Sequence, residues 1–273
     1  MPVTASRRIR TRIVSAVIVV LIGLGIMVVF DWHERTRFPD DAALLDFFRA
    51  TAMTGPDGGL ADTVPFRGPV RLWLPANVKD GAGGLSAAPL ARAIDRALPL
   101  FRAVTGLEIV RVELEATANV ALRLDDDGQG PDLMVRGRQA GGMTTGADIV
   151  VDLGDLLTGH DTNCQNRKDL CVGDDAVLQP LRARVFSGLV QVLGLSRRTR
   201  GVPSVLDGAA WPTAHDMGAL ALLYHPRVLA APGPIARMEA ARLVLAEWPD
   251  FARTTDFEAW YRIPAQQQDM MER

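Results

Sequence analysis

Histidine is scarce in this sequence and is never spaced for a zinc-hydrolase motif. The 273 residues contain four histidines, and none begins a His-x-x-x-His or His-x-x-Glu-His pattern. Such a motif places two metal ligands on one helix face, with a glutamate to take the proton of bound water. A Gly-x-Ser-x-Gly nucleophile elbow, a phosphate-binding loop and a dinucleotide fingerprint are also absent. The common hydrolase and nucleotide-binding motifs are therefore excluded. The histidines are His33, His160, His215 and His225.

Positive charge is in short supply beyond the amino terminus. Residues 1–30 contain four arginines and no acidic residue, so the net charge of −2 leaves −6 on the rest of the chain. An acidic balance gives no electrostatic attraction to the phosphates of nucleic acid, which is therefore not an expected partner. Arginine outnumbers lysine 28 to 2, a usage typical of GC-rich bacterial genomes.

The amino terminus carries one long apolar run. Four arginines precede residues 13–30, which contain no charge. A membrane-spanning helix needs about 20 apolar residues, and the arginines favour an amino end inside the cell. A cleaved signal peptide is the alternative, but residues 27–31 offer no small-x-small cleavage site. We predict a basic cytoplasmic segment (1–12) and a signal-anchor through the bilayer (13–30). The remaining residues are then expected outside the cytoplasm, on a bacterial inner membrane.

Two cysteines, Cys164 and Cys171, lie close together in a polar stretch. Outside the cytoplasm, a disulfide bond closing this short loop is expected. A metal-binding loop that includes His160 and Asp161 is the alternative. Zinc clusters usually have the tighter spacing Cys-x₂₋₄-Cys, so the disulfide is favoured.

Hydrophobic periodicity predicts helices on both sides of a block of strands. Pro99 should kink or split the second helix, and Pro180 should begin the third. Thr213 and Asp216 have the spacing of a capping box at the start of the fourth. Helices are expected over residues 41–53, 88–104, 180–194, 213–225 and 234–248. Strands are expected over residues 70–74, 108–115, 120–124, 133–135 and 149–153.

The order of these elements favours an α+β fold, while parallel pairing of strands across the 88–104 helix stays open. The final helix has an apolar stripe that should face the core. Its members are Ile235, Met238, Ala241, Leu245 and Trp248.

The same order resembles that of matrixin-like metzincins, a class of zinc proteases. The shared features are a helix running into Thr-Gly-Leu, an Ala-Asp-Ile strand, a helix ending at glycine, and a Thr-x-x-Asp helix ending in Leu-Tyr. They stand here at residues 105–107, 147–149, 185–194, 213–216 and 223–224. The resemblance implies a metzincin-like domain of helix, mixed β-sheet and further helices over 70–230. A juxtamembrane helix and loop (31–69) would precede it, and C-terminal helices (231–273) would follow.

A closer resemblance is to an uncharacterised family of exported bacterial proteins, a domain of unknown function. It rests on Gln-Val-Leu-Gly-Leu at 191–195, Pro-Ser-Val at 203–205 and Leu-Tyr-His-Pro-Arg at 223–227. In that family the corresponding helix carries two adjacent glutamates. Ser187 and Gly188 stand at those positions here, so any activity of the glutamate pair is expected to be lost.

The zinc motif itself is not retained. Metzincins place His-Glu-x-x-His-x-x-Gly on the helix, and these slots fall on Ser187, Gly188, Gln191 and Gly194. The third ligand slot falls on Arg197. Serine, glutamine and arginine do not form a zinc site. The resemblance therefore implies a protease shape with no zinc cofactor and no catalytic residue.

In active metzincins the cleft holds an extended peptide along an edge strand, so a protein or peptide partner is the expected ligand. Two alternatives stay open. One is a hydrolase with a relocated metal or acid site, and the other is a structural envelope domain without a ligand. The relocated site would be built from His160, Asp207, His215 and Asp216.

Overall fold

A computed structural model describes most of the chain beyond the amino terminus. The described ranges are 38–55, 58–61, 63–78, 86–125, 131–140, 143–154, 175–196 and 201–254. They belong to one compact unit that begins at Phe38. The predicted anchor, both cysteines, His160 and Arg197 lie outside these ranges. No helix within them is long and apolar enough to cross a membrane.

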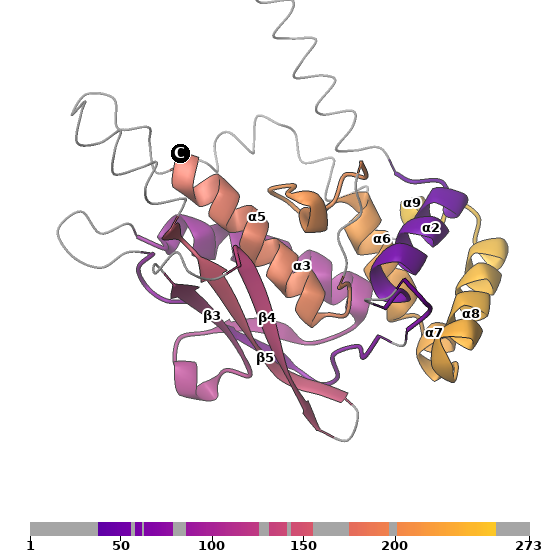
Figure 1. Cartoon of the computed structure of the whole chain (residues 1–273), viewed down its shortest axis with the longest axis horizontal. Helices are drawn as coiled ribbons and strands as arrows, with labels where there is room; N and C mark the ends of the chain where they lie inside the picture. The colour runs from indigo at the N-terminus through magenta and orange to yellow at the C-terminus, as the bar shows by residue number, and fades with distance from the viewer. Residues whose placement is uncertain are drawn as a thin grey trace, which may run out of the picture. The chain divides into compact units, whose positions relative to one another are not determined.

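A five-stranded mixed sheet forms the centre of the unit (Figure 1), so the predicted α+β class is confirmed. The strands lie in the order β2-β1-β3-β5-β4. The first four in that order run parallel, and β4 runs antiparallel to β5 at the sheet edge. The strands are β1 (Val70–Trp73), β2 (Ile109–Val112), β3 (Val120–Asp125), β4 (Leu133–Ala140) and β5 (Met143–Asp152).

Helix α3 (Ala88–Thr105) connects β1 to β2, which pair in parallel, as the sequence left open. It ends at Gly106, whose φ of 68° is left-handed and suits glycine. Pro99 lies inside the helix and does not split it, so of the predicted kink or split the split is excluded. Ile94 and Phe101 on either side of it are fully buried. Burying large side chains contributes about 1.5–3 kcal/mol each, enough to offset the ~3 kcal/mol cost of an internal proline.

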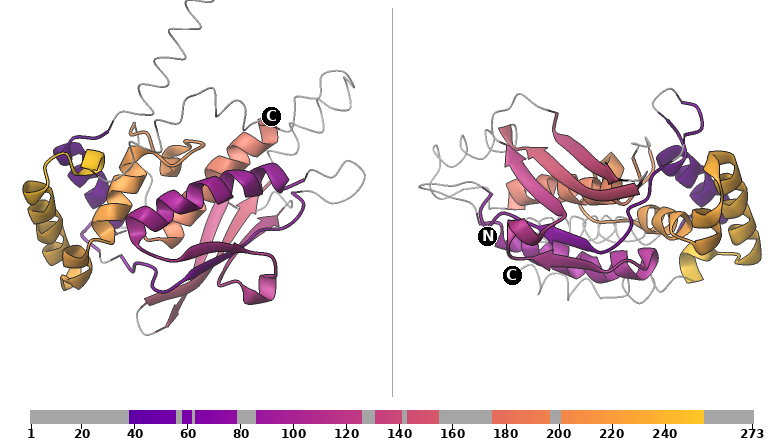
Figure 2. Two further views of the ribbon diagram at one scale, coloured as in Figure 1. Left: turned by 180° about the vertical axis from the view of Figure 1, so that it is seen from behind. Right: turned by 90° about the horizontal axis from the view of Figure 1, so that it is seen from below.

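Helix α5 (Asp175–Val192) lies beside α3 on the same face of the sheet and packs against β4 and β5 (Figures 1 and 2). It begins before Pro180, which was predicted to start it. A proline near a helix start removes one hydrogen bond, to the carbonyl four residues earlier, and the adjoining turns can tolerate that loss. Two residues beyond the helix, Gly194 has a φ of 114°.

The remaining helices pack on one another. Helix α2 contacts α6, α8 and α9, and α7 contacts α8. Leu44, Phe47 and Phe48 lie on the buried face of α2, at the helical spacing from which a helix was predicted over 41–53. These helices belong to the same compact unit as the sheet, although the sequence assigned α2 and α8 to flanking segments. Their bounds are α2 (Asp41–Ala52), α6 (Ala214–Leu223), α7 (Pro226–Ala230), α8 (Gly233–Glu247) and α9 (Phe251–Thr254).

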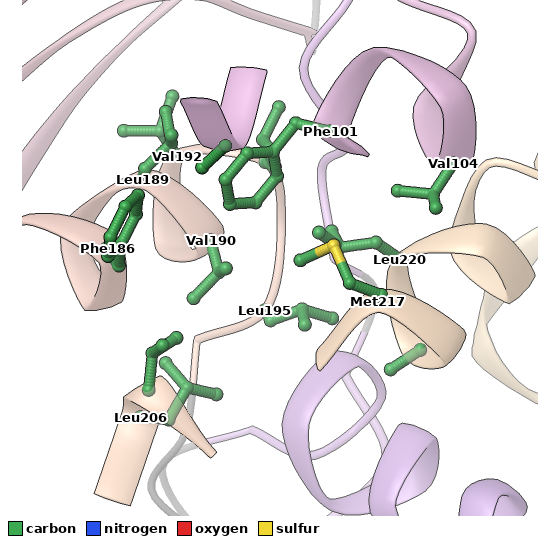
Figure 3. Close-up of a cluster of buried hydrophobic side chains, with 14 of the residues drawn as sticks. Phe101, Val104, Phe186, Leu189, Val190, Val192, Leu195, Leu206, Met217 and Leu220 are labelled. Atoms are coloured by element: carbon green, nitrogen blue, oxygen red, sulfur yellow. The ribbon is translucent and has the colours of Figure 1, made fainter. Parts of the chain in front are cut away.

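A shared hydrophobic core fixes α5 relative to its neighbours. Side chains from α3, α5, α6 and the short 3₁₀ helix η2 (Val205–Asp207) meet in it (Figure 3). The rings of Phe101 and Phe186 lie 6.4 Å apart, centroid to centroid. Leu206 and Met217 complete the contact from η2 and α6. This packing holds in place the part of α5 that carries Ser187, Gly188 and Gln191.

Candidate functional site

Ser187 and Gln191 lie one turn apart on α5 and bond to each other. Gln191 Nε2 donates a hydrogen bond of 3.2 Å to Ser187 Oγ. Ser187 is 7% exposed. The pair occupies the slots in which the resemblance would place two zinc-binding histidines. Zinc sites in proteins are built from thiolate, imidazole and carboxylate ligands, so a hydroxyl and an amide do not fit this ion.

Gly188, where the resemblance would place the glutamate of the motif, packs closely against the sheet. A Cβ atom built at this position would lie 2.4 Å from Ile149 Cγ2 and 3.4 Å from Leu133 Cδ1. No side chain fits there unless Ile149 moves. Position 188 of the helix therefore serves to pack α5 against the sheet.

Gly194, which the resemblance would match to the glycine of the zinc motif, has a role in the backbone. With its φ of 114°, a Cβ atom would lie 2.8 Å from Leu223 Cδ2 and 3.0 Å from Thr63 Cγ2. The glycine lets the chain turn at the end of α5 and lets α6 approach closely. Its presence is explained without a metal ion.

A pocket of about 250 Å³ opens beside Ser187. It lies between α5, the start of β4 and η2. Its volume is below the roughly 300–1,000 Å³ of small-molecule sites, and it suits a single side chain better than a cofactor. Leu133, Ala183, Val205 and Leu206 are apolar members of its lining. Asp132, Arg184, Ser187 and Asp207 are polar members.

Arg184 ties α5 to the strands beside the pocket. Its Nη1 donates to the backbone oxygen of Asp152 at the end of β5. Its Nη2 lies 3.4 Å from Asp132 Oδ2, next to the start of β4. Arg184 is 18% exposed and Asp132 is 60% exposed. These contacts hold the helix and the edge strand at a fixed separation.

Strand β4 forms an edge of the sheet and pairs with β5 alone among the described strands. Its first residue, Leu133, lines the pocket. A register shift between Arg138 and Gln139 interrupts the regular pairing at the other end. An edge strand presents backbone groups that can pair with an added extended segment. The pocket therefore opens at the start of such an edge.

Asp216 is fully buried at the start of α6 and forms the predicted capping box with Thr213. Its Oδ2 accepts hydrogen bonds from Thr213 N at 2.8 Å and Val205 N at 3.1 Å. Its Oδ1 faces the hydroxyl of Ser204. Burial raises the pKa of the Asp216 carboxyl group, and these hydrogen bonds oppose that rise.

The described residues of the predicted relocated site contact different parts of the fold. Asp216 bonds to the first residue of η2, and exposed Asp207 is the last residue of η2. His215 instead packs on Phe47 of α2, with ring centroids 5.4 Å apart, and burial lowers its pKa. Within the described ranges, no three His, Cys, Asp or Glu side chains gather closely enough to hold a metal ion. His160 lies outside those ranges.

Sequence reasoning missed Arg184 and Tyr224. Arg184 lies among the apolar residues of α5, and a charged residue in such a position indicates a partly buried polar contact. The Tyr224 hydroxyl is buried and lies 3.2 Å from Phe66 O and 3.1 Å from Leu193 O. It joins the end of α6 to the end of α5, and both acceptors are backbone atoms that no sequence motif marks.

No protein-family model and no curated protein matches this chain.

Proposed function

We propose that this chain is a membrane-anchored envelope protein whose metzincin-like domain has a degenerate zinc site and binds an extended protein or peptide segment. The order of the elements supports the resemblance. Helix α3 is capped by Gly106, β5 carries the Ala-Asp-Ile of 147–149, and Gly194 follows the end of α5. The capping box at Thr213 then opens α6.

The observation that carries the proposal is the placement of the Ser187–Gln191 pair. The two positions that the resemblance assigns to metal ligands hold a serine and a glutamine that bond to each other, and Ser187 lines an open pocket beside a strand edge. Hydrolysis needs a metal-bound water or a nucleophile beside a base. The hydrogen-bond partner of Ser187 is an amide, which is not a base at neutral pH. Binding without cleavage is the function that this chemistry supports.

Two kinds of contact would hold the partner. Its main chain would pair with the side of β4 that no described strand occupies, which supplies affinity without sequence preference. One of its side chains would enter the pocket between Leu133, Ala183 and Leu206 and supply specificity. The apolar walls favour a side chain with an aliphatic or aromatic body.

A phage-displayed library of random peptides tests the proposal. The full-length chain is the bait, and selected peptides are then measured against Ala183→Phe, which fills the pocket. We expect peptides that bind the wild type at least roughly tenfold more tightly than this variant, a difference of about 1.4 kcal/mol. The matched control places the same aromatic side chain at Leu243, an exposed position on α8.

Three outcomes would contradict the proposal. The first is that no peptide is enriched. The second is that the selected peptides bind Ala183→Phe as tightly as the wild type. The third is that the peptides are cleaved during incubation. Cleavage would favour the relocated hydrolase site instead.

A further inference from the structure

The strands present several arginines on the face of the sheet opposite to α5. Side chains alternate between the two faces along a strand. Ile149 lies on the face that α5 contacts, and Leu122, its partner in the register, shares that face. Alternation then places other residues on the opposite face, where they are exposed. They include Arg71 of β1 and Arg136 and Arg138 of β4.

Arg67 extends this set from the segment that leads into β1. The preceding residue, Phe66, forms an isolated bridge with Thr144 of β5, and its side chain is buried in the core. Arg67 N donates to Thr144 O at 3.3 Å. Its side chain is exposed, on the side of the chain opposite to Phe66. We call the set formed by Arg67, Arg71, Arg136 and Arg138 the arginine face.

The arginine face has no matching acidic side chains. Arg123, on the same side of β3, is neutralised by Glu115 at 2.7 Å and by Asp148 at 3.5 Å. Among the described residues, no carboxylate forms an ion pair with a member of the arginine face. The chain beyond residue 30 has a net charge of −6, because four of its arginines precede that residue and the whole chain carries −2. Unmatched cations on an acidic protein create a local field that attracts anions.

Contacts with the backbone hold Arg138 across the sheet. Its Nη2 donates to Asn119 O at 2.9 Å, and Asn119 directly precedes β3, which β5 separates from β4 (Figure 1). The guanidinium group passes over Gly146 of β5, where a Cβ atom would lie 3.1 Å from Arg138 Nε. Most of its N–H groups stay available for a further acceptor. A side chain that is ordered before binding loses little entropy when an anion binds.

Arg71 lies beside the same asparagine. Arg71 N donates to Asn119 Oδ1 at 2.7 Å, and Asn119 N donates to Arg71 O at 3.1 Å. Asn119 Nδ2 also donates to Pro69 O at 2.7 Å. Asn119 therefore brings the backbone of β1 next to the guanidinium group that arrives from β4. Guanidinium groups bind the oxygens of phosphate in a bidentate manner, so phosphate is the anion that fits this arrangement.

The spread of the arginines and the short predicted tether favour the phosphates of a bilayer. The arginines stand on both sides of β3 and β5 and are not gathered in a pocket. Residues 31–37 separate the predicted anchor from the compact unit, which begins at Phe38. A segment of this length spans at most about 25 Å. A domain of this size has a radius of gyration of about 17 Å, so the tether keeps it at the membrane surface.

We propose that the arginine face binds the phosphate groups of anionic lipids in the membrane to which the chain is anchored. Attraction between the guanidinium groups and the headgroups orients the domain, and salt weakens it by screening. The pocket lies on the α5 side of the sheet, so this orientation leaves it open to a partner. The inference rests on the membrane anchor of the proposed function, but it does not depend on peptide binding.

Labelling of arginines with phenylglyoxal, measured by mass spectrometry, tests the proposal on the full-length chain. The chain is reconstituted in vesicles of phosphatidylcholine, or of phosphatidylcholine and phosphatidylglycerol in equal parts. We expect each member of the arginine face to react roughly fivefold more slowly in the anionic vesicles. The difference should shrink at about 1 M salt, where the Debye length falls to about 3 Å. Arg92, exposed on α3, is the control and should react equally in both.

A pair of matched variants tests whether the arginines act together. Arg71→Gln combined with Arg136→Gln should reduce the protection of Arg67 and Arg138 in anionic vesicles. Arg92→Gln should leave that protection unchanged. Arg184 is only 18% exposed, so its rate of labelling reports whether each variant is folded.

The proposal is overturned if the arginine face reacts at the same rate in both kinds of vesicle. It is also overturned if polyglutamate protects the arginines as well in phosphatidylcholine vesicles, which would identify an acidic protein as the occupant. Flotation with phosphatidylcholine vesicles tests the anchor separately, so failure of the anchor differs from failure of the arginine face. A chain that floats with neither kind of vesicle overturns both.

Discussion

Gly188 of α5 lies so close to Ile149 of β5 that a Cβ atom at position 188 would stand 2.4 Å from Ile149 Cγ2. Helix and sheet meet here in direct contact. On the same helix, Gln191 donates a hydrogen bond to Ser187. Positions 187, 188 and 191 thus have their own packing and bonding.

The first prediction concerns Gly188→Ala. Helix propensity alone would make this change stabilising by about 1 kcal/mol. Overpacking against Ile149 costs about 1–3 kcal/mol, so we expect a net loss in the free energy of unfolding. Denaturant unfolding measures it, with Ile149→Ala and the double variant completing a cycle. Ile149→Ala should relieve the clash. If Gly188→Ala were more stable than the wild type, α5 would have to be able to move away from the sheet, and the prediction would be contradicted.

The second prediction compares two arginines. Arg184 is mostly buried and binds both Asp152 O and Asp132, so Arg184→Met should cost about 1.5–3 kcal/mol. Arg123 forms a 2.7 Å ion pair with Glu115 but is 51% exposed, so Arg123→Met should cost no more than about 1 kcal/mol. Unfolding of both variants gives the comparison. Equal costs would mean that Arg184 does not fix α5 to the edge strand.

The third prediction concerns pH and His215. Burial lowers the pKa of this histidine, so its neutral form is favoured in the folded state. The unfolded chain therefore binds the proton more readily, and stability is lost as pH falls below about 6.5 towards the lowered pKa. His215→Phe should reduce this loss. Melting temperatures of both proteins between neutral and mildly acidic pH measure the effect, and parallel curves would contradict it.

Local signals in the sequence predicted local structure well. The Thr213–Asp216 capping box, the buried face of α2 and the glycine ends of α3 and α5 all follow from short-range chemistry. Predictions that depended on tertiary packing were less accurate. Ile235 and Trp248, assigned to the buried stripe of α8, are 74% and 51% exposed, since the neighbouring helices cover only its middle.

The pocket could not be predicted from the sequence. Its polar members Asp132, Arg184 and Asp207 come from three separate segments that only the fold brings together. The capping spacing of Asp216 was visible, but its contact with Ser204 and Val205 was not. Such contacts depend on where η2 lies against α6, and no periodicity encodes that position.

The metal content of the full-length chain tests the central claim most directly. The protein would be dialysed against buffer with trace zinc and measured by elemental mass spectrometry. The Ser187–Gln191 pair and the closed Gly188 slot predict no stoichiometric zinc. One zinc ion retained per chain would contradict a degenerate site and would make His160, His215 and Asp216 the first residues to mutate.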